Sequence, residues 1–308
     1  MEKISIVVPC YNEEMALPHF YSEITKVMTD MNYVEFEIIL VNDGSRDNTL
    51  QVAKELSLKD NRVKYVSFSR NFGKEAAMYA GFKESTGDYI SIMDADLQDP
   101  PDLLPEMYSY IVNEGYDCAA TRRMSRKGEP FFISIFSNLF YSIMNKISKA
   151  NMISGARDFR LMTRQMLNSV LEISEYNRFS KGIFGFVGYD TKWIPYENRS
   201  RVAGKTTWSF WSLFGYAIEG ITSFSTVPLF LSSLIGILFC IASIVAVGFI
   251  VVKTLVFGDP TPGWPSLACI VMFVGGIQLL SIGIIGEYLS KTYLEVKKRP
   301  IYIIKEKN

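Results

Sequence analysis

The sequence predicts an α/β protein with a doubly wound, mostly parallel sheet, followed by amphipathic helices and a C-terminal hairpin of two transmembrane helices. Strand-like and helix-like patterns alternate through about the first 125 residues, as in proteins built from βαβ units. Clusters of acidic and polar residues follow successive predicted strands, where open α/β sheets bind their ligands. Two long apolar runs without charged residues lie near the C-terminus, which is typical of membrane spans.

The order of elements in the N-terminal part predicts the sheet. Apolar segments rich in β-branched residues predict strands at 4–9, 36–42, 63–69, 89–93 and 116–122. Helical patterns lie between them at 13–31, 48–59, 74–85 and 101–115. Asn48 or Asp47 can cap the second helix, and Pro101 opens the fourth. Since a helix separates each strand from the next, we expect parallel strands with helices on both faces.

The two apolar runs predict a membrane hairpin. Residues 229–252 and 264–286 carry no charge, and as helices each spans roughly 35 Å, enough for a hydrocarbon core about 30 Å thick. Two buried core helices are the alternative, which the length of both runs disfavours. The linker at 257–263 has no Lys or Arg, whereas the segment EVKKRP is basic. The positive-inside rule therefore places the linker outside and both flanks in the cytoplasm.

Two further amphipathic patterns complete the predicted domain map. Segments 130–148 and 206–225 have the apolar spacing of amphipathic helices, and the second is rich in Trp, Phe and Tyr. They predict a location at the membrane interface for at least one helix, with simple packing on the sheet as the alternative. The expected parts are a cytoplasmic catalytic domain at 1–225, a membrane hairpin at 226–290 and a basic cytoplasmic tail at 291–308. The N-terminus does not resemble a signal peptide.

Composition excludes several classes of function. The formal net charge is zero, so nothing global favours nucleic acid as a partner. The four cysteines are scattered without a CxxC pair, which argues against a zinc site or a disulfide framework. His19 is the only histidine, and we expect it to be an ordinary surface residue. Histidine triads and histidine-rich metal sites are therefore excluded, and oxygen ligands remain the main option for a metal.

An acidic cluster follows the fourth predicted strand. The stretch YISIMDADLQDPP places Asp94, Asp96 and Asp99 close together, and like charges this close need a positive partner. Carboxylate oxygens suit Mg²⁺ or Mn²⁺. The alternative is that carboxylates cap the next helix, a role that fits Asp102 better than Asp94 or Asp96. Asp99 is expected to be solvated or structural.

Five ordered motifs carry a family resemblance over essentially the whole chain. They are VVPCYNEE, VNDGSRDNT, SRNFGKEAAMYAGF, MDADLQDPP and RDFRLM. In this order and spacing the sequence resembles the family 2 glycosyltransferases with a GT-A (Rossmann-like) fold. Within that family it is similar to the polyprenyl-phosphate glycosyltransferases, which include bactoprenol glucosyltransferases and dolichol-phosphate mannose synthases. The motifs are specific for the reaction class and much less specific for the sugar.

The resemblance implies roles for residues that bind the donor. Residues implied to contact the nucleotide are Pro9, Tyr11, Glu13, Asp43, Asp94 and Asp96. The metal ligands are implied to be Asp94, Asp96 and Gln98, and the metal, Mg²⁺ or Mn²⁺, would bridge the two phosphates of a nucleotide sugar. Such an ion would neutralise the carboxylates and the charge that builds on the leaving diphosphate.

The predicted acceptor needs cations rather than a strong base. A phosphate monoester has a second pKa near about 6, so it is largely ionised at neutral pH. Candidates to hold it are Arg122, Arg201 and Lys205, with ordinary surface charge as the alternative. Thr207 stands where the family usually has a lysine, so either Arg201 or Lys205 could meet the phosphate.

Two more charged residues have open roles. Asp158 matches an acidic position near the acceptor in this family, and it is implied to be catalytic with Asp96. The alternative for Asp158 is a salt bridge with Arg157 or Arg160 that shapes the loop. Lys74 could equally meet a phosphate or pair with a carboxylate.

The predicted function is inverting transfer of a sugar from a nucleotide sugar to undecaprenyl phosphate or another polyprenyl phosphate, giving a lipid-linked sugar for modification of cell-envelope glycans. UDP-glucose is the first choice of donor, and UDP-N-acetylglucosamine, UDP-galactose and GDP-mannose remain open. A polysaccharide synthase would need a QxxRW motif and more spans. A non-catalytic membrane protein would not need intact donor motifs, and a transporter lacks support because neither span has an ionisable residue. A homo-oligomer is compatible with the sequence.

Overall fold

The computed structural model describes residues 1–123, 153, 155–196, 221–222, 225–257 and 263–308. The chain forms two compact units, one of Met1–Gly220 with Arg299–Asn308 and one of Ile221–Lys298. Most of the two segments predicted as interface helices, together with Arg201 and Lys205, lies outside the described residues.

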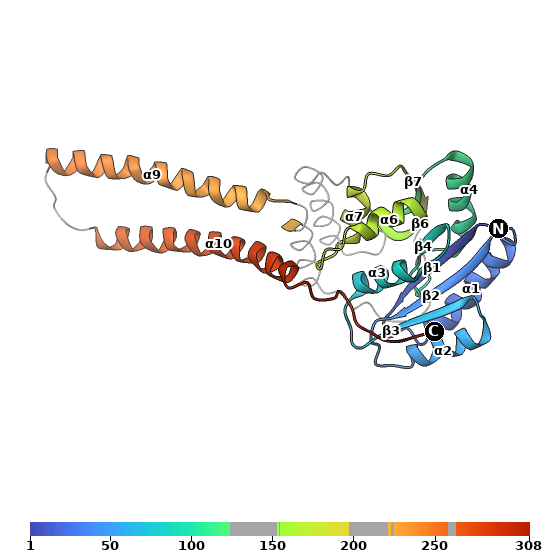
Figure 1. The fold of residues 1–308 in the computed structure, drawn as a ribbon. Coiled ribbons are helices and arrows are strands. Elements are labelled where there is room, and N and C mark those ends of the chain that lie inside the picture. Colours follow the sequence, from blue (N-terminus) through green and yellow to red (C-terminus); the bar gives the residue numbers. More distant parts are fainter. Residues whose placement is uncertain (124–152, 154, 197–220, 223–224, 258–262) are drawn as a thin grey trace. The chain divides into compact units, whose positions relative to one another are not determined.

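A mixed sheet forms the centre of the first unit (Figure 1). In the described residues its strand order is β7-β5-β6-β4-β1-β2-β3-β8. The strands are β1 (Lys3–Cys10), β2 (Glu35–Asn42), β3 (Val63–Phe68), β4 (Tyr89–Ile92), β5 (Cys118–Arg123), β6 (Ala156–Thr163), β7 (Thr191–Tyr196) and β8 (Ile304–Lys307). In the described residues, the helices of this unit are α1 (Ala16–Asp30), α2 (Thr49–Lys59), α3 (Lys74–Glu84), α4 (Leu104–Glu114), α6 (Arg164–Glu172) and α7 (Ser180–Phe186), with a short 3₁₀ turn at Pro101–Leu103.

The four central strands are parallel, as the alternating pattern predicts. β1 pairs with β2 on one side and with β4 on the other, and Val7 lies opposite Ile39 and Ile92. These pairings confirm the predicted, mostly parallel sheet.

Asp47 provides a hydrogen-bond acceptor at the start of α2. Its Oδ1 accepts a hydrogen bond of 3.0 Å from the Thr49 amide.

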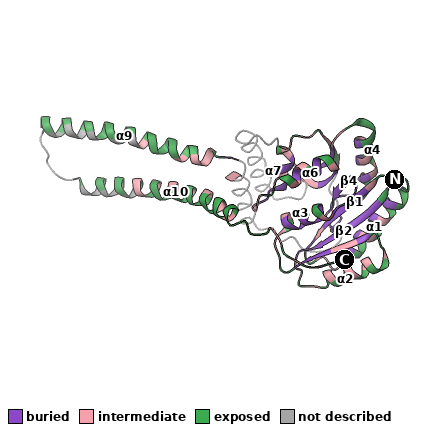
Figure 2. Ribbon diagram, in the orientation of Figure 1, coloured by how far each residue is buried: buried purple, intermediate pink, exposed green. Residues whose placement is uncertain are grey.

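Helices cover both faces of the sheet. Alternate residues of β1, such as Ile6, join a buried cluster with Leu17 of α1 and Met107 of α4. The opposite face of β1 packs closely on α3, where a Cβ at Gly81 would lie 2.2 Å from Cγ1 of Val7. Figure 2 shows the central strands buried between these layers. This packing fixes the ends of the parallel strands, which carry the polar motifs.

Two antiparallel strands were not expected from the sequence. β6 lies between β4 and β5 and runs antiparallel to both. β8 comes from the tail that follows the second apolar helix and pairs antiparallel with β3. Ion pairs hold it there, with Lys54 2.7 Å from Glu306 and Lys307 2.8 Å from Glu84. The residues predicted as a basic tail thus include an edge strand of the sheet.

The second unit contains two long apolar helices, α9 (Val227–Phe257) and α10 (Trp264–Val296). Both contain stretches that are long and apolar enough to cross a membrane, Val227–Ala246 and Phe273–Val296. Their large apolar side chains are uncovered: Phe249 is 69% and Leu279 72% exposed, and Figure 2 shows exposed residues along both helices. A soluble core helix would bury such residues, so the alternative of two core helices is not supported.

Candidate active site

The carboxyl ends of the parallel strands bring the polar motifs to one edge of the sheet. β1 and β2 end at Cys10 and Asn42, directly before the motifs YNEE and DGS, and β4 ends at Ile92, one residue before the motif DAD. β6 runs in the opposite direction and therefore begins at this edge, with Arg160 opposite Ile92. Asp158, near the start of β6, is thereby placed beside the residues that follow β4.

Lys74 joins the two acidic motifs. Its Nζ lies 2.6 Å from Asp94 Oδ1 and 2.7 Å from Asp158 Oδ2. Burial alone would favour the neutral forms, but attraction to Asp158 and Asp94 raises the pKa of Lys74. The same attraction outweighs burial and lowers the pKa of Asp158. Of the two sequence-based alternatives for Lys74, the structure shows pairing with carboxylates.

Asp158 does not form the predicted alternative salt bridge with Arg157 or Arg160. The Arg160 guanidinium donates to the main-chain oxygens of Asp158 and Arg157, at 3.3 and 3.1 Å. It also lies over the ring of Phe184. Because Arg160 is only 3% exposed, it supports the backbone of this segment from within the core and leaves the Asp158 carboxylate facing Lys74.

The segment after β4 turns sharply at the acidic pair. Leu97 adopts a left-handed φ of 57°, a conformation that non-glycine residues rarely adopt. Asp96 is buried, and its Oδ1 accepts a hydrogen bond from the Gln98 amide at 3.1 Å. The Gln98 side-chain oxygen accepts a bond of 3.3 Å from Arg157. The predicted third metal ligand is therefore already engaged by a cation.

The donor set fits a divalent cation that shares its coordination with substrate. Within the described ranges, no group of three or more His, Cys, Asp or Glu could hold a metal ion. Asp94 and Asp96 supply two carboxylates at the sheet edge. Mg²⁺ commonly takes one or two carboxylates and completes its shell with substrate phosphates and waters. The two aspartates thus fit such an ion better than a preformed protein cage.

Asp99 is structural rather than solvated. It is 5% exposed, accepts a 3.0 Å bond from Arg157 Nε, and accepts a hydrogen bond from the Tyr196 hydroxyl. Burial and the charge of Asp99 raise the pKa of Tyr196. This cluster fastens the segment after β4 to β6 and β7. The third carboxylate of the acidic stretch therefore has its positive partner within the protein.

Asp43 joins the loop after β2 to the segment before α3. Its two carboxylate oxygens accept bonds of 2.6 and 2.9 Å from the amides of Phe72 and Gly73. Burial outweighs these bonds and raises the pKa of Asp43. Gly44 follows with a φ of 63°, and a Cβ there would lie 2.3 Å from the carbonyl carbon of Arg70. Only glycine permits this close approach of the two loops.

Hydrogen bonds also join the loops after β1 and β2. The Asn12 amide donates to Ser45 Oγ at 3.0 Å, and the Arg46 amide donates to Asn12 Oδ1 at 2.9 Å. The Glu13 amide donates to Thr49 Oγ1 at 2.8 Å. The first two motifs therefore form one surface.

The remaining predicted residues lie near this edge or outside the described residues. Pro9 lies in β1, and Tyr11, which follows β1, is 39% exposed. Arg122 is exposed near the end of β5, opposite Ala156 of β6. Arg201 and Lys205 lie outside the described residues. Of the three predicted acceptor-binding cations, the described residues therefore include Arg122 alone.

Sequence reasoning missed a half-buried carboxyl group next to Lys74. Glu75 accepts hydrogen bonds from both the amide and the hydroxyl of Ser180, at the start of α7. Burial, with the charge of Asp158, raises the pKa of Glu75 to about 7 despite these bonds. A Lys-Glu pair at a helix start was visible in the sequence, but its partner lies 105 residues away.

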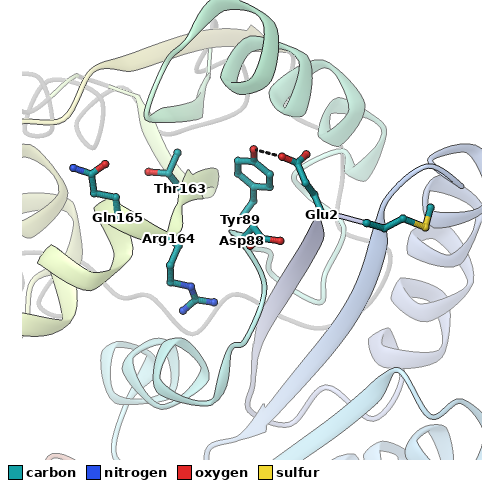
Figure 3. A pocket seen from close by; sticks show the side chains of 7 residues that line it. Glu2, Asp88, Tyr89, Thr163, Arg164 and Gln165 are labelled. Atoms are coloured by element: carbon teal, nitrogen blue, oxygen red, sulfur yellow. Dashed lines mark hydrogen bonds between the residues drawn. The ribbon is translucent and has the colours of Figure 1, made fainter.

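A hollow of about 710 Å³ lies at the opposite edge of the sheet (Figure 3). It is lined by residues at the amino ends of β1 and β4 and beside the end of β6. Its charged groups are paired: Glu2 accepts from Tyr89 at 3.1 Å, and Arg164 donates to the Gly87 carbonyl. The acidic motifs are absent from its lining, so the carboxyl edge remains the candidate active site.

Comparisons with known proteins identify the family of the chain. Residues 5–171 match the model of glycosyl transferase family 2. The protein CsbB of Bacillus subtilis (strain 168) is 45% identical over 305 residues, covering 99% of this chain and 92% of its own. A prophage bactoprenol glucosyl transferase homolog of Escherichia coli (strain K12) is 40% identical and covers 98% of both chains. The bactoprenol glucosyl transferase of Shigella phage SfII is 40% identical, covering 99% of this chain and 98% of its own.

Solved structures support the fold. A glucosyl-3-phosphoglycerate synthase from Mycobacterium tuberculosis, crystallised with Mn²⁺, UDP and phosphoglyceric acid, matches with a TM-score of 0.52 at 18% identity. The match covers 72% of this chain and 76% of that one. The predicted GT-A fold and family are confirmed: this chain belongs to glycosyl transferase family 2 and is a transferase.

Proposed function

We propose that the protein transfers a glucosyl group from UDP-glucose to a polyprenyl phosphate, with undecaprenyl phosphate as the expected acceptor. The observation that carries this proposal is full-length similarity, at 40% identity, to relatives named bactoprenol glucosyl transferases. The site geometry supports it, because the acidic pair after β4 and Asp158 of β6 meet at the edge where nucleotides bind in open α/β sheets.

The reaction exchanges one phosphate oxygen for another at the anomeric carbon. An acceptor phosphate oxygen forms the new bond from the face opposite the leaving group, and the bond to the diphosphate of UDP breaks with its electron pair. This displacement inverts the configuration. Since the acceptor is largely ionised at neutral pH, no side chain has to remove a proton. Asp158, held in its charged form by Lys74, instead orients the sugar or the acceptor.

Asp94 and Asp96 would hold the Mg²⁺ or Mn²⁺ ion, which when bound stabilises the charge on the leaving diphosphate. The loops after β1 and β2 form the surface for the nucleotide, with Tyr11 and Glu13 on one side and Asp43 on the other. Arg122, Arg201 and Lys205 are the proposed cations for the acceptor phosphate.

The substrates support a membrane location. A polyprenyl phosphate keeps its head group at the membrane surface, while the nucleotide sugar is soluble. α9 and α10 are long and apolar enough to cross the membrane, and the basic segment after α10 favours a cytoplasmic position for both flanks. We therefore propose a multi-pass protein of the cell membrane with its active site in the cytoplasm.

The test uses the full chain purified in detergent, with undecaprenyl phosphate and a panel of UDP-glucose, UDP-N-acetylglucosamine, UDP-galactose and GDP-mannose. We expect a lipid-linked product from UDP-glucose, detected by thin-layer chromatography and mass spectrometry. A chelator should stop the reaction, and Mg²⁺ or Mn²⁺ should restore it. Product from another donor would change the assigned sugar, and full activity in chelator would exclude the metal role of the aspartates.

A further inference from the structure

Lys74 and a divalent ion would use the same carboxylate. The Nζ of Lys74 lies 2.6 Å from one oxygen of Asp94 and 2.9 Å from the other. A bound Mg²⁺ would lie about 2.0–2.1 Å from a carboxylate oxygen. Two cations this close repel each other strongly, even where water screens them. Lys74 therefore cannot keep both contacts to Asp94 unchanged when a metal binds there.

We propose that Lys74 is a positioning residue that acts as an exchangeable counter-ion, which neutralises Asp94 before the metal binds and then releases it while remaining paired with Asp158. This inference rests on the proposed metal-dependent transfer. It gives Lys74 a role in the order of binding. Lys74 balances the negative charge of Asp94 until the metal and the donor arrive, and the metal then takes its place.

The surroundings of Lys74 permit such an exchange. The backbone before Lys74 is fixed, since the amides of Phe72 and Gly73 both donate to Asp43. The Lys74 side chain itself is 41% exposed, so its four-carbon stem can move without burying a charge. Asp94 is 27% and Asp158 19% exposed. The more exposed contact, that with Asp94, is the one expected to break.

Asp158 stays available as a partner for Lys74 once a metal has bound, because it is not one of the proposed metal ligands. The charges of Lys181 and Arg160 also act on Asp158 and help to keep it ionised. A lysine released from Asp94 would stay at the sheet edge, where its ammonium could meet the phosphates of the donor. The exchange would thus move one positive charge from a protein carboxylate toward the substrate.

The first measurement is Mn²⁺ binding to the full chain in detergent, by calorimetry without nucleotide. Lys74→Met should bind Mn²⁺ about three- to tenfold more tightly than the wild type, because a competing cation is lost. Lys74→Arg, which keeps the charge, should stay near the wild-type affinity. Lys83→Met is the matched control: it removes the same charge from the other end of α3, about 13 Å along the helix, and should change little.

Unchanged or weaker Mn²⁺ binding by Lys74→Met would overturn the inference. If that variant does not fold, acetylation of lysines in the wild-type protein gives the same test. Adding Mg²⁺ should increase acetylation of Lys74 several-fold, measured by mass spectrometry, and leave Lys83 unchanged. Equal labelling of Lys74 with and without Mg²⁺ would also overturn the inference.

Transfer activity measured in parallel separates this inference from the proposed function. A wild-type protein that transfers glucose in chelator and does not bind Mn²⁺ would exclude the metal role and, with it, the exchange. A wild-type protein that binds Mn²⁺ and needs it for transfer, while Lys74→Met shows no tighter binding, would exclude the exchange alone.

Discussion

The two aspartates of the acidic pair are not equivalent at the residue scale. Asp96 is 7% exposed and precedes Leu97, whose backbone has a left-handed φ. The Asp94 side chain is 27% exposed, and its charge is paired with that of Lys74. We expect Asp96→Ala to abolish glucosyl transfer and Asp94→Ala to reduce it severely, because the leaving diphosphate loses its counter-ion. Initial rates at saturating Mg²⁺ would measure both. Activity near wild type in Asp96→Ala would contradict this assignment.

Asp99 offers a contrasting prediction in the same stretch. Its carboxylate is buried against Arg157 and Tyr196, and breaking a buried ion pair typically costs about 3–5 kcal/mol. Asp99→Asn should therefore lower the thermal unfolding temperature, while Mn²⁺ affinity at a temperature where the variant is folded should stay near wild type. A selective loss of Mn²⁺ affinity without loss of stability would make Asp99 a ligand instead.

Glu37 makes stability depend on pH. It is buried in β2, and although burial raises its pKa, hydrogen bonds from Ser5, Lys64 and Thr86 lower it from 4.5 to about 2. A carboxyl group with a lowered folded-state pKa stabilises the protein above its unfolded pKa, and that contribution is lost as pH falls from about 4.5 toward 2. The difference corresponds to roughly 3 kcal/mol.

Replacement of Glu37 by Gln should therefore reduce the free energy of unfolding by about 2–3 kcal/mol at pH 7. The difference between variant and wild type should shrink as pH falls below about 4, because the wild-type carboxyl group then becomes protonated. Denaturant unfolding in detergent at pH 7 and pH 3 would measure it. A difference of the same size at both values would contradict the role of the ionised carboxylate.

At the scale of elements, the segment that leads into β8 is linked to the loop after β3 through aromatic contacts. Tyr302 stacks on Phe68 with ring centroids 4.9 Å apart, and Phe68 meets Phe72 edge-on at 5.8 Å. The Phe72 amide in turn binds Asp43. Tyr302→Ala should raise KM for UDP-glucose more than KM for the lipid acceptor, whereas Tyr302→Phe should retain wild-type values. Ile303→Ala, at a residue that is 51% exposed, is the control; an equal effect on both KM values would contradict the coupling.

The sequence predicted the elements whose patterns are local. Most of the parallel strands have continuous apolar runs, and the helices between them have clear periods, so β1 to β5 and α1 to α4 could be located. β6 could not, because ARDFRLMT mixes charges with apolar residues and was interpreted only as a motif. β8 is four residues long, three of them charged, and its partner β3 lies far away in the sequence.

The candidate site was predictable in composition but not in pairing. Asp94, Asp96 and Asp158 were found from their motifs. The link between Asp94 and Asp158 through Lys74 depends on β6 running antiparallel beside β4, which no local pattern shows. The burial of Asp99 likewise depends on Arg157 of β6 and Tyr196 of β7. Long-range strand order therefore decided which charges meet.

For the whole molecule, the proposed topology predicts labelling from two sides of the membrane. A cysteine introduced at Thr261, in the linker between the apolar helices, should react with an impermeant thiol reagent in intact cells. One at Lys305, an exposed residue of β8, should react only after lysis. Labelling is read after purification of the variants, with the unmodified chain as the background control. The opposite pattern would place the active site outside the cytoplasm.

The position of β8 also sets an order for biosynthesis. The catalytic unit consists of Met1–Gly220 and Arg299–Asn308, so both apolar helices are synthesised before the strand that covers the edge of β3. A helix inserted in the wrong direction would leave β8 on the other side of the membrane from its partner. The uncovered edge of β3 would then be open to aggregation or to recognition by quality-control proteases. Under the proposed topology, completion of the sheet would report that the hairpin has been inserted in the correct direction.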